Sequence, residues 1–316
     1  MKKICMVTYM RNGEIFTEGL REVADALYDV FQESFKVIIC CEDGLGVLID
    51  TLYDIQVIRT TGTKYQRLIN VMKEDDSSYY ISIDNDIKGN MPNIIKFINA
   101  SIDGGYDIGW GKIEAVDRHG IIPQLVFVDK CLSHDIIRPL LWNLNIGISV
   151  PGQFFFLKAA SFRGKLMKID TYLDDLAIGL YSSNTSKRTM ISHLVLGYEL
   201  PNTSFKGLWL QRIRWAKGYA TILSNIKDRV SLLKILIHGF FYHFFWILQW
   251  LVVFFSFQIS AMLGILYLLV TSYIISGYNK KKVGYGILYQ MLFPAFHIRW
   301  YFQLIEEFVK MRCYRA

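Results

Sequence analysis

The segment YYISIDNDIKGN, residues 79–90 of this chain of 316 residues, runs from β-forming residues into two carboxylates. Residues 79–83 are aromatic and β-branched apart from one serine, and this composition predicts a buried strand. Two carboxylates, Asp84 and Asp86, follow directly at the carboxyl end of that strand. Like charges this close repel each other, so the pair needs either a turn exposed to water or a cation that binds both groups.

Strands and helices alternate on both sides of this stretch. The sequence predicts strands at residues 3–9, 35–41, 106–110 and 125–128, and helices at residues 16–31, 65–73, 92–102 and 174–180. Such alternation implies an α/β fold with a parallel, doubly wound sheet. Ligands of these sheets bind outside the carboxyl ends of the strands, where residues 42–44 and 84–86 are expected to lie.

The apolar residues are concentrated in the last third of the chain. Hydrophobic residues make up 52% of the sequence, which is high for a soluble domain, and they dominate from Leu232 onward. Residues 235–257 are long enough to cross a bilayer core, and residues 259–276 form a second, slightly short candidate after a tight connection. For residues 283–300 both a spanning and a re-entrant or interfacial arrangement remain open, followed by an amphipathic helix at residues 301–312.

The charge and the cysteines bear on location. The net charge is +7, and its basic clusters at residues 280–282 and 310–315 lie beside apolar segments, which favours an anionic membrane surface over nucleic acid. The five cysteines show no CxxC spacing, as expected for a reducing compartment. Because the N-terminal apolar run is too short for a signal peptide, we expect the polar part of the chain to lie in the cytosol. Together with the apolar segments, this predicts a multi-pass protein of the plasma membrane.

Asp84-Asn85-Asp86 is compatible with a plain turn after a strand. It also suits a divalent cation, because Mg²⁺ and Mn²⁺ prefer oxygen ligands and often bridge carboxylates to phosphates. The cation would remove the repulsion between the two carboxylates and neutralise a leaving diphosphate.

Two acidic residues, Asp174 and Asp175, begin an apolar helical stretch. Acids at a helix N-terminus interact favourably with the helix dipole, so the pair could be structural. A carboxylate in such a place could instead act as a general base that deprotonates an acceptor hydroxyl.

The segment QRIRW, residues 211–215, places Gln211, Arg214 and Trp215 on one face of a helix. The tryptophan could anchor an amphipathic helix at the membrane surface. Alternatively, the tryptophan could stack on a sugar while the arginine binds diphosphate oxygens.

Taken in this order, the motifs resemble those of the inverting family-2 glycosyltransferases of the GT-A class. The resemblance is to the processive hyaluronan, cellulose and chitin synthases in particular, and it covers nearly the whole chain. Residues 84–86 match the DxD motif, residues 174–175 the acid–Asp motif, and residues 211–215 the QxxRW motif. The sequence departs from the family at Met10 and Arg11, where Asn and an acid are usual, and at Asp174, where Glu is usual.

The resemblance implies a GT-A catalytic domain at residues 1–205, interfacial helices at residues 206–231 and a membrane region at residues 232–316. It implies that the nucleotide is bound by Thr8, Tyr9, Asp43, Lys64 and Asp84. By the same resemblance Asp84 and Asp86 hold Mg²⁺ or Mn²⁺, and Asp175 is the catalytic base with Asp174 beside it. Gln211, Arg214 and Trp215 would line the acceptor and diphosphate side.

The expected activity is inverting transfer of a sugar from a nucleotide-diphosphate donor, UDP-linked in the first place, to a growing polysaccharide. One alternative is transfer of a single sugar to a polyprenyl phosphate or glycolipid. Another is a catalytically silent membrane subunit that binds a nucleotide sugar. The expected partners are the donor, a glycan or lipid-linked acceptor and membrane lipids, with an oligomer left open and no nucleic acid.

Overall fold

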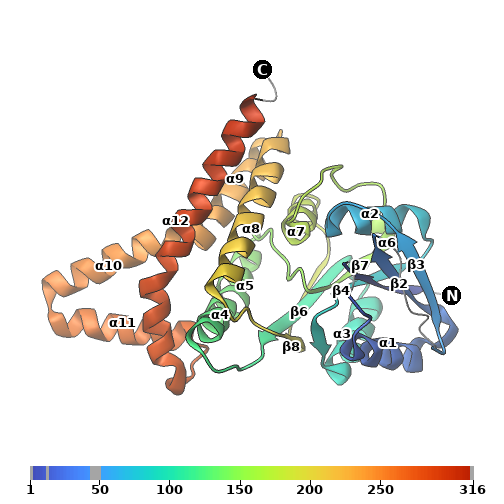
Figure 1. Cartoon of the computed structure of the whole chain (residues 1–316), viewed down its shortest axis with the longest axis horizontal. Coiled ribbons are helices and arrows are strands. Elements are labelled where there is room, and N and C mark those ends of the chain that lie inside the picture. The colour runs from blue at the N-terminus through green and yellow to red at the C-terminus, as the bar shows by residue number, and fades with distance from the viewer. Residues whose placement is uncertain (1–2, 12–13, 43–50, 314–316) are drawn as a thin grey trace. The chain divides into compact units, whose positions relative to one another are not determined.

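A computed structural model describes residues 3–11, 14–42 and 51–313 (Figure 1). The chain divides into two compact units, the first made of Met1–Ile113 and Ile148–Leu200, the second of Glu114–Gly147 and Pro201–Ala316. Residues 114–147, which the sequence placed within a continuous catalytic domain, thus group with the C-terminal helices. The functional boundaries at residues 205 and 231 stay predictions.

A mixed β-sheet forms the centre of the first unit. Among the described residues its strands are β1 (Ile4–Tyr9), β2 (Phe35–Cys41), β3 (Asp54–Arg59), β4 (Tyr79–Asp84), β5 (Ile87–Gly89), β6 (Ile108–Ala115), β7 (Phe154–Lys158) and β8 (Thr189–Glu199), in the order β3-β2-β1-β4-β7-β6-β8-β5. The α/β prediction is therefore confirmed.

The prediction of a wholly parallel sheet is wrong beyond β4. The strands β3, β2, β1 and β4 are parallel, whereas β7 runs antiparallel to both β4 and β6. Strand–helix alternation fixes the direction of a strand only where a crossover helix joins parallel neighbours, as it does between β1 and β2. The buried run Phe154-Phe155-Phe156 indicates a strand in the sequence but carries no information on its direction.

The helices described in the first unit are α1 (Glu18–Phe31), η1 (Gln32–Ser34), α2 (Lys64–Glu74), α3 (Met91–Asp103), α6 (Ala159–Phe162) and α7 (Asp174–Asn184). Side chains alternate between the two faces of β1, so that Ile4 and Met6 share a core with Leu20 and Val23 of α1. Thr17 begins α1 by accepting a hydrogen bond from the backbone N–H of Leu20. The core therefore fixes β1 between its neighbours and with it the edge at which the strands end.

The second unit is helical. Its described elements are α4 (Ile121–Cys131), η2 (Leu132–Ile137), α5 (Arg138–Asn143), α8 (Phe205–Asn225), α9 (Arg229–Gly239), η3 (Phe240–Phe244), α10 (Phe245–Ile259), α11 (Ala261–Ile275), η4 (Lys280–Lys282) and α12 (Val283–Cys313).

One prediction for the second unit is wrong. Residues 125–128 were expected to be a strand but lie in α4, because Leu125 and Val128, three positions apart, pack together with Tyr289 of α12. Residues 283–312 lie in one continuous helix that includes Pro294, so the amphipathic helix expected at residues 301–312 does not begin separately, while a spanning or re-entrant arrangement of residues 283–300 stays a prediction. Local β-propensity and a proline are both overridden by packing between helices.

Among the described helices, one continuous segment, Arg229–Ile259, is by itself long and apolar enough to cross a membrane. It comprises α9, η3 and α10, and so extends beyond the predicted span at residues 235–257. The second predicted span, residues 259–276, corresponds to α11, which has 15 residues. A multi-pass arrangement therefore stays a prediction.

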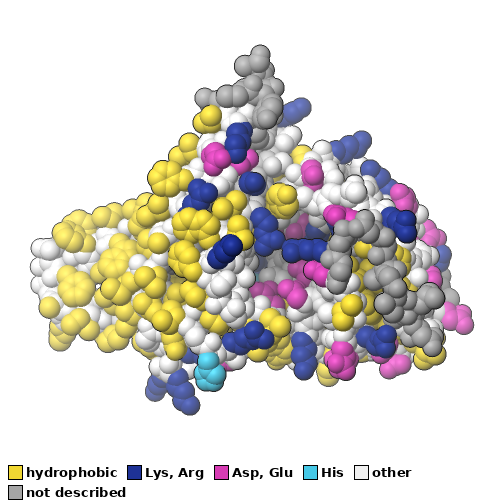
Figure 2. Space-filling model, in the orientation of Figure 1, with side chains coloured by type: hydrophobic (Ala, Val, Ile, Leu, Met, Phe, Trp, Pro, Cys, Tyr) yellow, Lys and Arg dark blue, Asp and Glu magenta, His cyan; other side chains and the backbone are white. Residues whose placement is uncertain are grey.

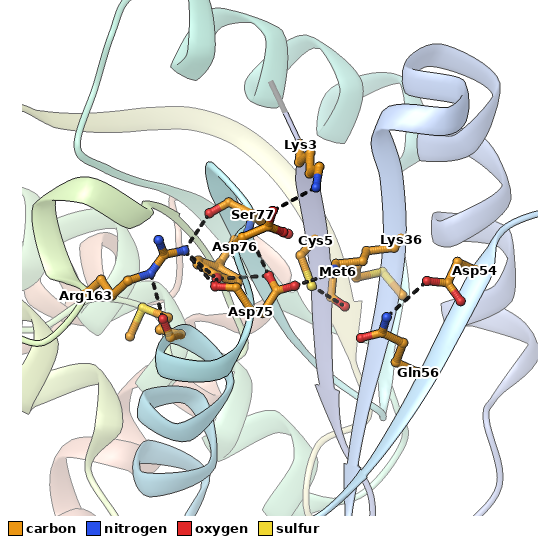
Figure 3. A network of polar contacts seen from close by, with 12 residues as sticks. Lys3, Cys5, Met6, Lys36, Asp54, Gln56, Asp75, Asp76, Ser77 and Arg163 are labelled. Atoms are coloured by element: carbon orange, nitrogen blue, oxygen red, sulfur yellow. Dashed lines mark hydrogen bonds and ion pairs between the residues drawn. The ribbon is translucent and has the colours of Figure 1, made fainter. Parts of the chain in front are cut away.

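A buried polar network lies at the amino ends of β1, β2 and β4 (Figure 3). The Asp75 carboxylate accepts hydrogen bonds from the Ser77 backbone N–H and the Tyr80 hydroxyl, both at 3.0 Å, and pairs with the ammonium of Lys36. Arg163 donates to the backbone carbonyls of residues 72, 75 and 77. Burial alone would raise the pKa of Asp75, but the bonds from Lys36, Ser77 and Tyr80 outweigh it and hold the pKa below its ordinary value.

We expect Asp75→Ala to lower the free energy of unfolding by roughly 3 kcal/mol, because it leaves Lys36 without its buried partner. The pKa of Asp75 is lower in the folded than in the unfolded state, so its contribution is present above the unfolded pKa and is lost as the pH falls through the folded pKa. Urea unfolding at neutral and at acidic pH measures both effects. Asp76→Ala, which removes an exposed partner of Lys3, is the matched control and should change little.

Candidate functional site

The carboxyl ends of three parallel strands meet at one edge of the sheet in the first unit. In the strand register Tyr9, the last residue of β1, lies beside Cys40 of β2 on one side and Asp84, the last residue of β4, on the other. The backbone N–H of Asp84 donates to the carbonyl of Gln153 at 2.9 Å, which ties this edge to the loop before β7. Ligand sites of parallel sheets occur at such an edge.

The ammonium of Lys64 lies between two carboxylates at this edge. Its Nζ is 2.7 Å from Oδ1 of Asp84 and 3.2 Å from Oδ2 of Asp174, and it also donates to the carbonyl of Gly152. The side chains of Lys64 and Asp174 are only 19% and 11% exposed, whereas that of Asp84 is 33% exposed. The cluster is therefore a mostly buried ion network that is open to solvent on the Asp84 side.

Helix α2 positions the lysine. Lys64 is its first residue, and the backbone N–H of the preceding Thr63 donates to the Asp170 carboxylate at 3.2 Å. The ammonium lies 5.1 Å from the ring centroid of Tyr9 and 5.6 Å from that of Phe155. Contacts from two aromatic rings and three oxygens restrict the lysine to one position.

The two acids of α7 are placed by a close approach of backbone to backbone. A Cβ at Gly179 would lie 2.3 Å from the carbonyl oxygen of Ile148, so only glycine allows α7 to lie this near the chain. A Cβ at Gly152 would lie 3.5 Å from the Cβ of Asp175 and 3.7 Å from Oδ1 of Asp174. The loop before β7 therefore lies against both acids. Asp175 is half-buried, and its Oδ1 accepts from the N–H of Leu176 at 2.8 Å.

The middle residue of Asp84-Asn85-Asp86 holds the turn in place. The Asn85 side chain donates to the carbonyl of Ile15 at 3.0 Å, and the Asn85 carbonyl accepts from the Thr17 hydroxyl at 2.9 Å. These bonds tie the turn between β4 and β5 to the segment before α1. The flanking Asp86 is exposed.

Burial and charge act in opposite directions on the paired groups. Burial raises the pKa of Asp174 and the nearby carboxylate of Asp84 adds to this, while the ammonium of Lys64 opposes it, and the pKa stays above its ordinary value. Burial alone would lower the pKa of Lys64, but Asp174 and Asp84 outweigh it and raise the pKa. Lys64 therefore remains charged at neutral pH.

The remaining predicted nucleotide residues have different positions. Thr8 is fully buried inside the sheet, and its hydroxyl has no hydrogen-bond partner within the part of the chain that the structure describes. The Tyr9 hydroxyl is 3.1 Å from Oγ of Ser82. Burial raises the pKa of Tyr9, so the phenol stays neutral. Asp43 lies outside the described residues.

The predicted acceptor residues lie on α8 in the second unit. Arg214 is exposed, while Gln211 and Trp215 are half-buried. The neighbouring Arg212, to which the sequence assigned no role, is buried, donates to the Asp129 carboxylate at 2.8 Å and stacks on the indole of Trp215 at 4.3 Å. Tyr289 donates to the same carboxylate at 2.7 Å, so Asp129 links α4, α8 and α12.

The structure thus brings together Lys64, Asp84 and Asp174, with Asp175 beside them. Sequence reasoning missed the carbonyl of Gly152 as a lysine acceptor, and no spacing indicates a contact between residues 88 positions apart. It also missed Arg212, although the alternation of arginines in residues 211–215 suggests that one of them is buried.

A divalent cation fits the donor set at the strand end. No cluster of three or more His, Cys, Asp or Glu residues that could hold a metal occurs in the described part of the chain. However, Mg²⁺ usually takes only one or two protein carboxylates and completes its shell with phosphate oxygens and water. The ammonium of Lys64 faces Asp84 and Asp174, and Asp86 and Asp175 are their neighbours in sequence. This part of the chain therefore has more carboxylates than the single ammonium can neutralise. Asp84 and the exposed Asp86 could therefore contribute oxygens to an ion.

No protein-family model matches the sequence, and no curated protein matches it either. Among solved structures, a mannosyltransferase, PcManGT from Pyrobaculum calidifontis in complex with GDP-Man and Mn²⁺, matches with a TM-score of 0.53 at 11% identity, over 96% of this chain and 87% of that chain. Glucosyl-3-phosphoglycerate synthase from Mycobacterium tuberculosis follows with a TM-score of 0.49 at 14% identity, over 72% of this chain and 82% of that one. TarS of S. aureus matches with a TM-score of 0.46 at 12% identity, over 92% of this chain and 91% of that one.

At these identities the match to the mannosyltransferase shows the fold alone, and the two scores below 0.5 add nothing to it. The shared fold is the α/β fold of this mannosyltransferase. Chemistry must therefore be argued from the residues of this chain.

We expect Lys64→Met and Asp174→Asn to destabilise the first unit less together than the sum of their separate effects. The lysine variant leaves Asp84 and Asp174 facing each other without a cation, and the second change removes one of these charges. The coupling should amount to roughly 1–2 kcal/mol in a double-mutant cycle measured by urea unfolding. Lys73→Met, at an exposed position of the same helix, is the control, and additive effects would show that the bridge contributes no stability.

Proposed function

We propose that the chain is a glycosyltransferase that takes a sugar from a nucleotide-diphosphate donor bound at the carboxyl edge of β1, β2 and β4. One observation carries the proposal: the Lys64 ammonium lies between Asp84 and Asp174 at the edge where such sheets bind ligands. A fold shared with a mannosyltransferase whose complex contains GDP-Man and Mn²⁺ supports it. Both UDP- and GDP-sugars are therefore candidate donors.

In the proposed reaction Asp175 removes the proton from an acceptor hydroxyl while the hydroxyl oxygen attacks the anomeric carbon. The bond from that carbon to the diphosphate oxygen breaks on the opposite face, so the configuration inverts and the nucleoside diphosphate leaves. Lys64 places a positive charge beside the developing negative charge without having to move it there. A divalent ion bound to Asp84 and Asp86 would supply further charge neutralisation for the diphosphate.

Asp174 differs from Asp175 in what its surroundings allow. Its carboxylate is nearly buried and bound to Lys64, so it is poorly placed to accept a proton from a substrate. Asp175 is half-buried on the same helix start and lies beside the Gly152 loop. We therefore assign Asp175 as the base and Asp174 as the residue that positions Lys64.

The acceptor has two candidates. Residues 211–215 favour a growing polysaccharide, as in the processive synthases whose motif they resemble. The stacking of Arg212 on Trp215 favours transfer of a single sugar to a lipid, because one face of the indole is already covered and is not free to carry a glycan chain. Product size separates the two: a ladder of oligomers indicates a polymerase, and one product indicates single addition.

The proposal is tested by incubating the full-length protein with a panel of UDP- and GDP-sugars and Mn²⁺, and measuring the nucleoside diphosphate released. Release from one donor class is expected. Tight binding of a nucleotide sugar with neither hydrolysis nor transfer would instead identify a catalytically silent subunit.

We expect Asp175→Asn to reduce transfer by about 10²- to 10⁴-fold, because it removes the base and keeps the size of the side chain. The affinity for the nucleotide sugar, measured by calorimetry, should change by no more than a few fold. Asp29→Asn, at an exposed position of α1, is the matched control. Loss of binding with normal transfer per bound donor would make Asp175 a binding residue.

We expect Asp86→Asn to weaken Mn²⁺ binding in the presence of a nucleoside diphosphate, because it removes one of two carboxylates at the strand end. Electron paramagnetic resonance of Mn²⁺ measures the bound fraction independently of turnover. Unchanged binding in the variant would remove Asp86 from the ion site.

A further inference from the structure

Helices α10 and α11 of the second unit form a hairpin (Figure 1), and the surface of the hairpin that faces the viewer in Figure 2 is largely apolar. Only Ser260 separates the two helices, and its own N–H and C=O are both bonded, to the Ser256 carbonyl and the Gly264 N–H. The large hydrophobic residues exposed on the hairpin are Phe245, Ile247, Leu248, Leu251, Val252, Phe254, Phe255, Phe257, Ile259, Met262, Leu263, Ile265, Leu266, Leu269 and Val270. At the tip Ile259 and Met262 are each 77% exposed, and a patch of this kind is far larger than monomeric soluble proteins leave uncovered.

Several polar side chains of the hairpin bond to one another and to α12, whereas Gln258 near the tip is exposed. Gln249 of α10 donates to the Gln290 side chain of α12 at 2.6 Å and accepts from the Tyr267 hydroxyl of α11 at 2.7 Å. The Gln290 amide donates to Ser272 at 2.7 Å. Polar side chains that are satisfied inside the protein, with apolar ones outside, suit a surrounding medium that offers no hydrogen bonds.

A backbone carbonyl near Pro294 is also satisfied by a bond within the protein. Proline has no N–H, so the carbonyl of Gln290, four residues earlier, loses its bond within α12. The indole N–H of Trp250 donates to this carbonyl at 3.0 Å. The helix therefore passes through its proline without an unpaired carbonyl at residue 290.

Aromatic residues with a polar end lie at only one end of the hairpin. Residues 251–266 contain no Trp or Tyr and no charged residue, whereas Trp246 and Trp250 precede them and Tyr267 and Tyr273 follow them. Trp and Tyr gather at membrane–water interfaces, so a hairpin that crossed a bilayer would carry a second belt at its tip. One belt indicates one interface.

The length of the arms agrees with this. From Trp250 to the turn at Ser260 the helix rises about 15 Å at 1.5 Å per residue. That is about half of a hydrocarbon core of roughly 30 Å, or one leaflet. The helix before the hairpin is held by protein contacts, since the Ile235 carbonyl accepts from the Tyr219 hydroxyl at 2.7 Å and His243 stacks on Trp300 at 3.7 Å.

We propose that the α10–α11 hairpin inserts into one leaflet of an anionic bilayer, tip first, and returns to the side from which it entered. The exposed Lys280 and Lys281 follow the hairpin at its base, where they would meet anionic headgroups. A lipid leaflet covers an apolar surface from all sides, whereas a protein partner or a second copy would cover one face. The insertion goes beyond the proposed sugar transfer and does not depend on it.

The test uses the full-length protein with Cys131→Ser and Cys313→Ser, and a single new cysteine at the tip, Ser260→Cys, or at the base, Asn279→Cys. The protein is added to preformed vesicles of phosphatidylglycerol and phosphatidylcholine, with a membrane-impermeant maleimide either outside or trapped inside. We expect the tip cysteine to stay unlabelled from both sides until detergent is added, and the base cysteine to react from outside. Labelling of the tip from inside would show a hairpin that crosses, and labelling from outside one that does not insert; either overturns the proposal.

Flotation of the same vesicles gives a second measurement. We expect Phe254→Asp combined with Phe255→Asp to reduce vesicle binding by roughly a hundredfold or more. Leu144→Asp, at a leucine that is equally exposed outside the hairpin, should leave it unchanged. Lys280→Gln with Lys281→Gln should reduce the preference for anionic vesicles by about tenfold. Circular dichroism in detergent confirms that each variant is folded, and binding that persists in the double aspartate variant, or a stable dimer that ignores vesicles, contradicts insertion.

Discussion

The ammonium of Lys64 lies between two carboxylates that are 90 positions apart in the sequence, and the geometry of the candidate site depends on this bridge. Without it Asp84 and Asp174 would face each other in a mostly buried place, where repulsion is strong. The lysine bridge holds three elements together, namely the end of β4, the start of α2 and the start of α7. The ion network and the proposed binding place of the anionic donor thus share the same residues, and perturbed titratable groups often mark functional sites.

The rest of the first unit serves to bring these three elements together. The parallel register of β1 and β4 puts Tyr9 beside Asp84, and the glycine at 179 lets α7 approach the backbone of Ile148. On the other side of the turn, Asn85 binds the segment before α1. The second unit has a comparable hub in Asp129, whose carboxylate binds Arg212 and Tyr289 and so joins three helices.

Local patterns predicted the first half of the fold well. The helices α1, α2 and α3 each bury a periodic apolar face, and the strands β1, β2 and β4 are short runs that are buried almost throughout, so a short window of sequence records both. Local patterns failed where long-range packing determines the structure. Residues 125–128 of α4 have the composition of a strand, but they form a helix that packs on Tyr289. A short window of sequence also cannot show that β7 runs antiparallel to β4. The acids of the site were predicted from the motifs. The contact of Lys64 with Gly152 could not be, since it depends on a loop far away in the sequence. Arg212 and Arg214 are the same residue type in the same short segment. Only the packing of the helix determines that Arg212 is buried and Arg214 is exposed.

The edge formed by Lys64, Asp84, Asp174 and Asp175 is the proposed binding place of the nucleotide-diphosphate sugar. Hydrogen–deuterium exchange of the full-length protein, with and without a saturating donor and Mn²⁺, tests it most directly because it reports on each segment separately. Slower exchange at residues 62–68, 82–87, 150–153 and 172–177, with the amino ends of the same strands unchanged, is the predicted result. Protection confined to the second unit, or none at these four segments when calorimetry shows the donor bound, would contradict it.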